Sequence, residues 1–262
     1  MNPVVSTDGT VLACSVTGSG PAVVLVDGAM CHRGFGPGAA IAEQLAGHHT
    51  VWTYDRRGRG TSGDTAPFAV EREIEDLAAV IAAAGGSARV LALSSGAALA
   101  LRAAAADIGI TRLAVYEPPF STGEEQRERF GRYVDELTAT LAEGRRGDAV
   151  AAFMGYVGMP AEMVDGMRGA PVWPLFETVA PTLAYDAAAL AVETGAAVPA
   201  GLLAALDLPV LVLDGGASPE QLRAPARAVA AALPGAEYRT LEGQTHEVAP
   251  EVLAPELLKF YA

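Results

Sequence analysis

The feature that most constrains this chain is an apolar run that passes directly into a helix-like stretch, with a serine at the junction. Val90–Leu93 is a short, continuously apolar run, typical of a strand buried on both faces. The alanine-rich stretch that follows Ser95 is typical of a helix. A strand that meets a helix this abruptly requires a sharp turn, and a serine at its apex would present its hydroxyl as a nucleophile.

Residue size identifies Ser94 as the apex. The pattern Ala92-x-Ser94-x-Gly96 differs from Gly-x-Ser-x-Gly by one small residue, and the residues two before and two after the apex must be small because the turn brings them together. If Ser95 were the apex, one flank would be Leu93, which would clash. The alternative interpretation is an ordinary serine that caps the N-terminus of a helix.

Strand-like and helix-like segments alternate along most of the chain. This order predicts an α/β fold with a mostly parallel central sheet and helices on both faces. The predicted strands are 10–17, 22–26, 50–54, 90–93, 112–117, 210–213 and 237–241, and the predicted helices include 39–46, 70–81 and 219–233.

The alternation stops at Pro118-Pro119 and resumes only near residue 206. Between them lie helical stripes and no convincing buried strand, over a length well beyond that of a plain loop. We therefore expect a core formed by residues 1–119 and 206–262, with residues 120–205 inserted as an all-helical cap.

Composition narrows the choice of partners. The chain of 262 residues is 51% hydrophobic, and 18 basic against 31 acidic residues give a net charge of −13, which argues against nucleic acid and anionic membranes. The N-terminus lacks a signal-peptide pattern, and no apolar run is long enough to span a bilayer. Cys14 and Cys31 have no metal-ligand spacing, so we expect two reduced thiols in a cytoplasmic protein.

Several pieces occur in the order typical of one superfamily: a strand ending in Asp27-Gly28, the turn 55–62, the Ser94 turn, a helical insertion, and a late His246. On these residues the chain resembles the α/β-hydrolase superfamily over nearly its whole length. The resemblance implies that Ser94 is the nucleophile and His246 the base that takes its proton. Of the other histidines, which lie early in the chain, we expect His48 and His49 to be solvated.

The acid of the triad is where the sequence departs from the superfamily pattern. The usual aspartate follows the strand 210–213, but Ser218 occupies that position and carries no charge. Glu117 and Asp214 are the two candidates, and we favour Glu117, because some relatives, certain haloalkane dehalogenases among them, carry their acid at this strand end. A charged residue is rarely buried at a strand end without a role. The alternative role for Glu117 is a structural ion pair with an arginine.

The resemblance also implies an oxyanion hole formed by the backbone N–H groups of Ser95 and Ala29, with Met30 as the near alternative to Ala29. Cap residues would wall the acyl pocket, and we predict that Met30 and Trp173 bind substrate. The wider set of candidates for the pocket is Met154, Met159, Met163, Met167 and Phe176. Each of these could instead belong to the cap's own core.

These residues predict a serine hydrolase that needs no cofactor or metal and acts on a small or medium ester, lactone or related acyl compound. Its partner would be a small-molecule substrate, with neither nucleic acid nor membrane, and a homodimer is compatible with the sequence. Alternatives on the same scaffold are a ligand-binding or tailoring protein with little turnover, a haloperoxidase-like enzyme, and a carbon–carbon bond hydrolase. The three arginines of the turn 55–62 receive a structural role only, with Asp55 as the cap of the turn.

Overall fold

A seven-stranded sheet forms the centre of the computed structural model, which describes residues 3–262. The strand order is β3-β5-β4-β6-β7-β8-β9; β3 runs antiparallel to β5, and the other neighbouring strands are parallel. The strands are β3 (Cys14–Gly18), β4 (Ala22–Val26), β5 (Thr50–Tyr54), β6 (Ala88–Leu93), β7 (Ile110–Tyr116), β8 (Val210–Gly215) and β9 (Glu237–Leu241). The predicted α/β fold is confirmed.

Helices cover both faces of the sheet, and this explains why the sequence of β4 is continuously apolar. Val23 and Leu25 pack into a cluster with residues of α1 and α11, whereas Val24 and Val26 pack into the cluster of the opposite face. Alternate residues of a strand point to opposite faces, so a strand buried on both sides needs apolar residues throughout. The helices that flank the sheet are α1 (Gly38–Leu45) and α11 (Pro250–Tyr261) on one face, and α2 (Val70–Ala83), α3 (Ser95–Ala105) and α10 (Glu220–Ala232) on the other.

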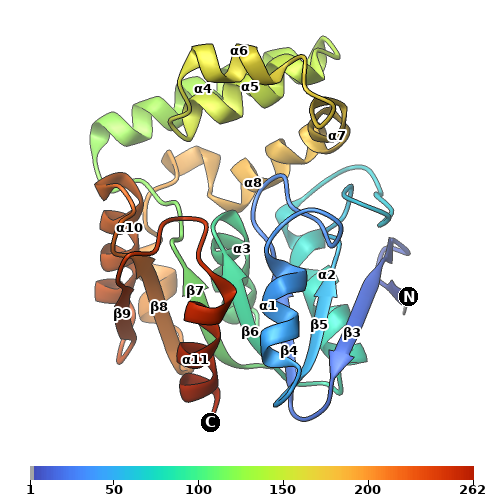
Figure 1. Cartoon of the computed structure of the whole chain (residues 1–262), viewed down its shortest axis with the longest axis vertical. Coiled ribbons are helices and arrows are strands. Elements are labelled where there is room, and N and C mark those ends of the chain that lie inside the picture. Colours follow the sequence, from blue (N-terminus) through green and yellow to red (C-terminus); the bar gives the residue numbers. More distant parts are fainter. Residues whose placement is uncertain (1–2) are drawn as a thin grey trace.

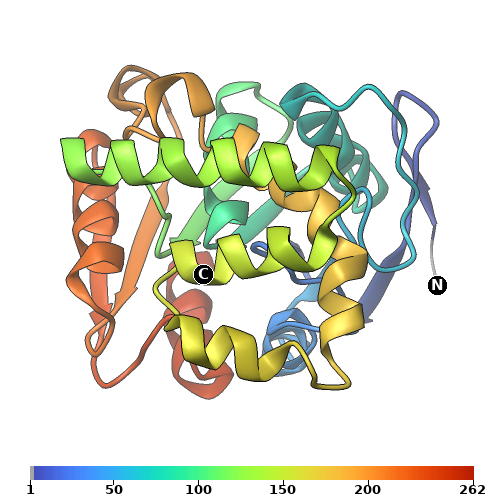
Figure 2. The same cartoon turned by 90° about the horizontal axis from the view of Figure 1, so that it is seen from above.

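The segment between β7 and β8 is helical and lies over one end of the sheet (Figure 1). Its long helices lie across the molecule when seen from above (Figure 2). The elements are α4 (Glu124–Ala142), α5 (Arg146–Tyr156), α6 (Ala161–Met167), α7 (Trp173–Val179), η1 (Ala180–Thr182), α8 (Leu183–Ala189), η2 (Val192–Thr194) and α9 (Ala200–Ala204). We call this segment the cap; its boundaries at 120 and 205 stay a prediction.

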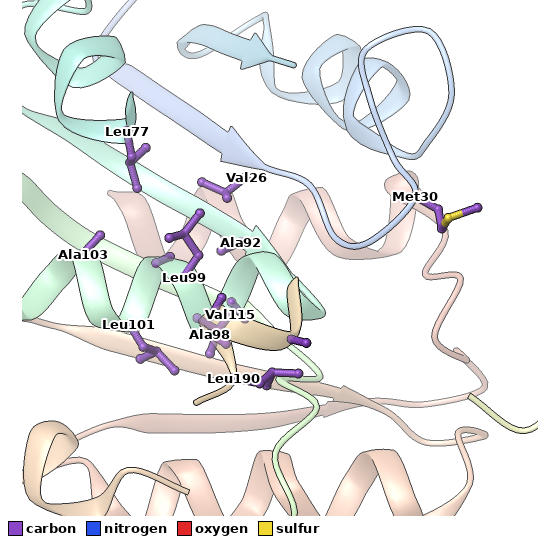
Figure 3. Close-up of a cluster of buried hydrophobic side chains, with 14 of the residues drawn as sticks. Val26, Met30, Leu77, Ala92, Ala98, Leu99, Leu101, Ala103, Val115 and Leu190 are labelled. Carbon is purple, nitrogen blue, oxygen red and sulfur yellow. The ribbon is translucent and has the colours of Figure 1, made fainter. Parts of the chain in front are cut away.

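Buried apolar side chains join the cap to the core beneath the Ser94 turn. Figure 3 shows Val26 of β4, Ala92 of β6 and Leu99 of α3 in one cluster, with Leu77 of α2 beside them. Leu190, at the C-terminal end of α8, belongs to the same cluster. The cap is therefore packed onto the helix that starts at the predicted nucleophile.

Strand predictions match the large sheet closely, with one exception near the N-terminus. The bounds predicted for 22–26, 50–54 and 237–241 are confirmed. The single strand predicted at 10–17 is wrong, because the chain divides it at Ala13: β2 (Val11–Leu12) pairs with β1 (Val4–Val5) in a separate two-stranded sheet, and β3 joins the large one. Among residues 3–262, no helix has the length and apolar character needed to cross a membrane.

Candidate active site

Ser94 occupies the tight turn between β6 and α3. Its φ is +52° and its ψ −126°, a backbone conformation that a residue with a side chain rarely adopts. Its N–H donates to the carbonyl of Tyr116 on the neighbouring strand at 2.9 Å, and its own carbonyl accepts from the Ala97 N–H at 2.9 Å. Ser95 does not share the positive φ. This strained turn at a strand end is the geometry expected of a nucleophile elbow.

Glycine is required at two positions around this turn. A Cβ on Gly96 would lie 2.5 Å from the Val26 carbonyl oxygen and 2.7 Å from that of Asp27. A Cβ on Gly28 would lie 2.9 Å from the Ser94 Cβ. The small residue at position 96 is therefore required by the end of the adjacent strand β4, not by contact between the two flanks of the turn as the sequence suggested.

Glu117 and His246 are brought together at the edge of the sheet. Glu117 directly follows β7, has a φ of +45°, and its side chain is completely buried. Its Oε1 accepts from the Gly215 N–H at 2.9 Å, and its Oε2 lies 2.6 Å from His246 Nδ1. Because Leu93 and Tyr116 are register partners, Ser94 and Glu117 follow adjacent strands at the same edge. The hydrogen bonds of residues 3–262 include none between Ser94 Oγ and His246.

The loop that carries His246 is hydrogen-bonded to β7 and to the loop after β8. The Tyr116 hydroxyl donates to the Thr245 carbonyl at 2.5 Å, and the Ala217 N–H donates to the Gln244 carbonyl at 2.8 Å. The imidazole itself extends from this loop with 41% of its side chain exposed. Its Nδ1 thus lies against a buried carboxylate, and among residues 3–262 its Nε2 has no hydrogen-bond partner.

Asp214 has other partners. Its Oδ2 accepts from Arg223 Nε at 2.9 Å and from the Tyr238 hydroxyl at 2.8 Å, and the side chain is fully buried. Ser218 is buried as well, and its Oγ has no hydrogen-bond partner among the residues described. Of the two acids that the sequence left open, Glu117 contacts the histidine and Asp214 holds an arginine.

The predicted oxyanion donors belong to two segments that meet at Ser94, the loop after β4 and the start of α3. Gly28 to Cys31 form a turn in which the Cys31 N–H donates to the Gly28 carbonyl at 3.4 Å, with Met30 at a φ of +64°. Ser95 is the first residue of α3. Within residues 3–262, neither the Ala29 nor the Ser95 N–H has a hydrogen-bond partner, which leaves both able to donate to a ligand.

The arginines of the turn 55–62 form buried ion pairs, as their structural interpretation requires. Asp55 accepts from the Thr61 N–H at 2.9 Å, so its role as cap of the turn is confirmed. Arg57 pairs with Asp76 at 2.7 Å, and Arg59 pairs with Asp186 of the cap at 2.8 Å. Sequence reasoning missed Asp186, because nothing in an alanine-rich helix marks one aspartate as the partner of an arginine 127 residues earlier.

Asp27 directly follows β4 and has a buried carboxylate. Its Oδ1 has no hydrogen bond among the described residues, and only 4% of the residue is exposed. Burial raises the pKa of this carboxyl to about 6, although Arg59 and Arg56 oppose the shift. Burial likewise raises the pKa of the nearby Cys31 thiol to about 12.

The two predicted substrate-binding residues differ in their surroundings. Met30 is buried in the turn after β4, next to Ala29. Trp173 is buried within the cap: its indole N–H donates to Glu177 at 3.1 Å and its ring packs against Phe176. Those contacts favour a place in the cap's own core, and the substrate-binding role of both residues stays a prediction.

Two further expectations require correction. Met163 is 57% exposed on α6 and does not wall a closed pocket. Met159 lines a cavity of about 590 Å³ whose lining residues all lie between 129 and 168, within the cap.

His49, expected to be solvated, is buried because the C-terminal helix α11 covers it. Its ring packs edge-on against the ring of Tyr261, with 5.9 Å between the ring centroids.

The sequence pattern of the alpha/beta hydrolase family matches residues 23–257, from β4 through α11. The chain belongs to the alpha/beta hydrolase family. It is similar over its full length to an alpha/beta hydrolase from Sphaerobacter thermophilus, at 50% identity and a TM-score of 0.89, with 100% of both chains covered.

More distant structures share the fold of this alpha/beta hydrolase. A thermophilic esterase from Thermogutta terrifontis is 22% identical with a TM-score of 0.69, covering 99% of this chain and 97% of the other. An enol-lactonase from Burkholderia xenovorans is 20% identical with a TM-score of 0.65, covering 99% of each chain. A comparison with curated protein sequences gave no match.

Proposed function

We propose that this alpha/beta hydrolase is a serine hydrolase that cleaves a small or medium ester, lactone or related acyl compound through an acyl-enzyme. Ser94 is the nucleophile, His246 the general base and Glu117 the acid that orients the histidine. The similarity to an esterase and an enol-lactonase supports the substrate class at the level of the shared fold.

The reaction begins with Ser94 Oγ attacking the acyl carbon while His246 Nε2 takes its proton. Glu117 Oε2 accepts from Nδ1, which selects the tautomer with a free Nε2 and stabilises the imidazolium that forms. The second carboxylate oxygen is held by the Gly215 N–H, so the acid keeps its orientation as the charge on the histidine changes.

The negative oxygen of the tetrahedral intermediate would receive hydrogen bonds from the Ala29 and Ser95 N–H groups. Collapse expels the alcohol, which takes its proton from His246, and leaves an ester on Ser94. Water then attacks this acyl-enzyme and gives a proton to His246. The second collapse returns that proton to Ser94 Oγ and releases the acid, which loses its own proton to solvent as the carboxylate. Each bond made or broken in this cycle uses a group of the chain, the substrate or water.

The 2.6 Å contact between Glu117 and His246 is the observation that carries the proposal. The alternative, a ligand-binding protein that has lost turnover, was motivated by the serine at position 218. Glu117 follows β7, the strand next to β8, and its buried carboxylate contacts His246. The serine at position 218 is therefore no reason to expect lost turnover, because Glu117 provides the counter-charge for the imidazolium.

A fluorophosphonate probe tests the proposal directly. The wild-type protein should be labelled once, on Ser94 by peptide mapping, and Ser94→Ala and His246→Ala should abolish labelling while their circular dichroism stays native. Hydrolysis of p-nitrophenyl esters of increasing chain length would then define the acyl group accepted. A folded wild-type protein that is neither labelled nor active on any ester would sink the assignment.

A further inference from the structure

A buried ion cluster lies between the cap and the Ser94 turn. Asp186 of α8 accepts a hydrogen bond from Arg56 Nη1 on its Oδ1, at 2.7 Å. Arg59 Nη2 donates to both carboxylate oxygens of Asp186, at 2.8 Å each. Arg56 also makes two bonds to Glu73, at 2.7 and 2.8 Å. Burial disfavours the charged form of Asp186, but Arg59 and Arg56 outweigh it and hold its pKa below the usual range. The two arginines therefore hold Asp186 in its charged form.

Arg59 reaches one of the two oxyanion donors through its peptide. Its Nη1 donates to the Gly28 carbonyl oxygen at 2.6 Å. That carbonyl and the Ala29 N–H belong to the same planar peptide group, so fixing the oxygen fixes the direction of the N–H on the opposite side. A guanidinium on the oxygen also draws electron density from the peptide and makes its N–H a stronger donor.

Asp186 reaches the other donor through a side chain. The Ser95 hydroxyl donates to Asp186 Oδ1 at 2.8 Å, and Ser95 is 3% exposed. This bond anchors the residue whose backbone N–H opens α3. One chain of hydrogen bonds thus runs from the Gly28 carbonyl through Arg59 and Asp186 to the Ser95 hydroxyl, and it joins both donors to the cap.

Stability alone does not account for this arrangement. A buried ion pair recovers little more than the cost of removing its charges from water, and apolar side chains of similar volume often serve as well. What an arginine and an aspartate add is direction, because the guanidinium fork bonds the carboxylate and a carbonyl at fixed angles.

We propose that Arg59 and Asp186 are positioning residues that align the two oxyanion donors and make their alignment depend on α8 of the cap being in place. The proposal rests on the proposed function for the roles of the Ala29 and Ser95 N–H groups. It extends that function by giving the cap a part in stabilising the transition state, apart from any contact with substrate.

The test compares two arginines of the same turn. Arg59→Met removes the link to the donors, and Arg57→Met is the matched control: both guanidinium side chains are 0% exposed and both pair with carboxylates, but Arg57 holds Asp76 and Asp8. Both variants should melt at lower temperature. Only Arg59→Met should lower kcat, by about 10- to 100-fold with little change in KM, since a lost oxyanion donor costs about 100- to 1,000-fold.

Ser95→Ala is the second variant, and it removes a single hydroxyl in case Arg59→Met does not fold. Ser95→Ala should also lower kcat. The affinity of this variant for a trifluoromethyl ketone, which forms a tetrahedral adduct with Ser94, should fall in parallel. Affinity for the product carboxylate should stay as in the wild type.

Crystal structures of the variants give a readout independent of activity. The Gly28–Ala29 peptide should rotate in Arg59→Met and keep its orientation in Arg57→Met. An unrotated peptide, or an equal loss of kcat in both variants, overturns the positioning role. If the wild type neither reacts with the probe nor cleaves esters, the proposed function fails, and the peptide orientation still decides whether Arg59 aligns it.

Discussion

Three carboxylates at the C-terminal ends of parallel strands differ in what surrounds them. Asp27, Glu117 and Asp214 follow or end β4, β7 and β8, and each is at most 4% exposed. Asp214 has two side-chain donors on its Oδ2, and Glu117 has a backbone donor on one oxygen and a histidine at the other. Among residues 3–262, the Oδ1 atoms of both Asp27 and Asp214 have no hydrogen-bond partner, but Asp27 has no side-chain donor on Oδ2 either. The partners of each acid, more than its burial, indicate what it does.

The first prediction separates the two candidate acids. Glu117→Gln should lower kcat/KM on a p-nitrophenyl ester by about 100- to 10,000-fold, because the amide cannot stabilise the imidazolium and favours the wrong tautomer. Asp214→Asn should keep kcat/KM within a few-fold but melt at lower temperature, since Arg223 loses its buried counter-charge. The reverse pattern of activities would assign the acid to Asp214.

The second prediction concerns Asp27 and pH. In the folded protein its pKa is raised from 3.8 to about 6, so the fold prefers the protonated form and loses stability as pH rises through that interval. Asp27→Asn should therefore increase the free energy of unfolding above pH 6, by about 2 to 3 kcal/mol for a shift of this size, and by less as pH falls toward 4.

Urea unfolding at several pH values between 4 and 8 measures this difference. The wild-type protein, unfolded at the same pH values, is the reference for each difference. A gain from Asp27→Asn that is equally large at pH 4 and pH 8 would show that the carboxyl is not perturbed.

Among the elements, the junction of β6 with α3 is the most tightly constrained. The helix starts so close to the end of β4 that its second residue has carbonyl oxygens where a Cβ would lie. The long cap helix α4 shows the contrary case, because a Cβ on Gly131 would meet nothing within 4 Å. Glycine is therefore sterically required at position 96 of α3, whereas position 131 of α4 has room for a larger residue.

The third prediction uses that contrast. Gly96→Ala should destabilise the protein by about 1 to 3 kcal/mol, the usual cost of overpacking a well-packed site. Gly131→Ala should stabilise it by up to about 1 kcal/mol, because alanine loses less backbone freedom in a helix. Urea midpoints of the two variants provide the measurement, and a shift of both in one direction would contradict the assignment of the constraint to β4.

For the whole molecule, the cap and the core are connected by buried charges as well as by apolar packing. Asp186 binds two arginines of the core, and Arg102 of α3 donates to the Ala189 carbonyl at the end of α8 at 2.8 Å. Moving the cap away would break these pairs and expose the apolar surface that the cap and α3 bury together, which is costly. We expect the two parts to unfold together.

The fourth prediction follows from the two tryptophans, Trp52 in β5 and Trp173 in α7. Trp173→Phe leaves a fluorescence probe in the core, and Trp52→Phe leaves one in the cap. For each variant, the urea midpoint should be the same whether unfolding is followed by fluorescence or by circular dichroism at 222 nm. An earlier transition seen only by Trp173 would mean that the cap unfolds by itself.

Local pattern predicted the sheet well and the long-range contacts poorly. The bounds of β4 could be predicted because burial on both faces leaves a continuous apolar signal, whereas β9 is an edge strand in which only Leu241 is buried. Glu117 was named as a candidate from its place at a strand end. Its contact with His246 depends on how two distant loops meet, and the pairing of Arg59 with Asp186 and the burial of His49 depend on docking of helices far along the chain.

The two thiols have a practical consequence. Burial raises the pKa of Cys14 to about 11 and that of Cys31 to about 12, so almost no thiolate is available at neutral pH to react with a maleimide. The native chain thus provides a nearly silent background for site-directed spin or dye labels. A single cysteine introduced at exposed Met163, paired with another on the core, would allow the distance between α6 and the sheet to be followed in solution, with and without an occupied active site.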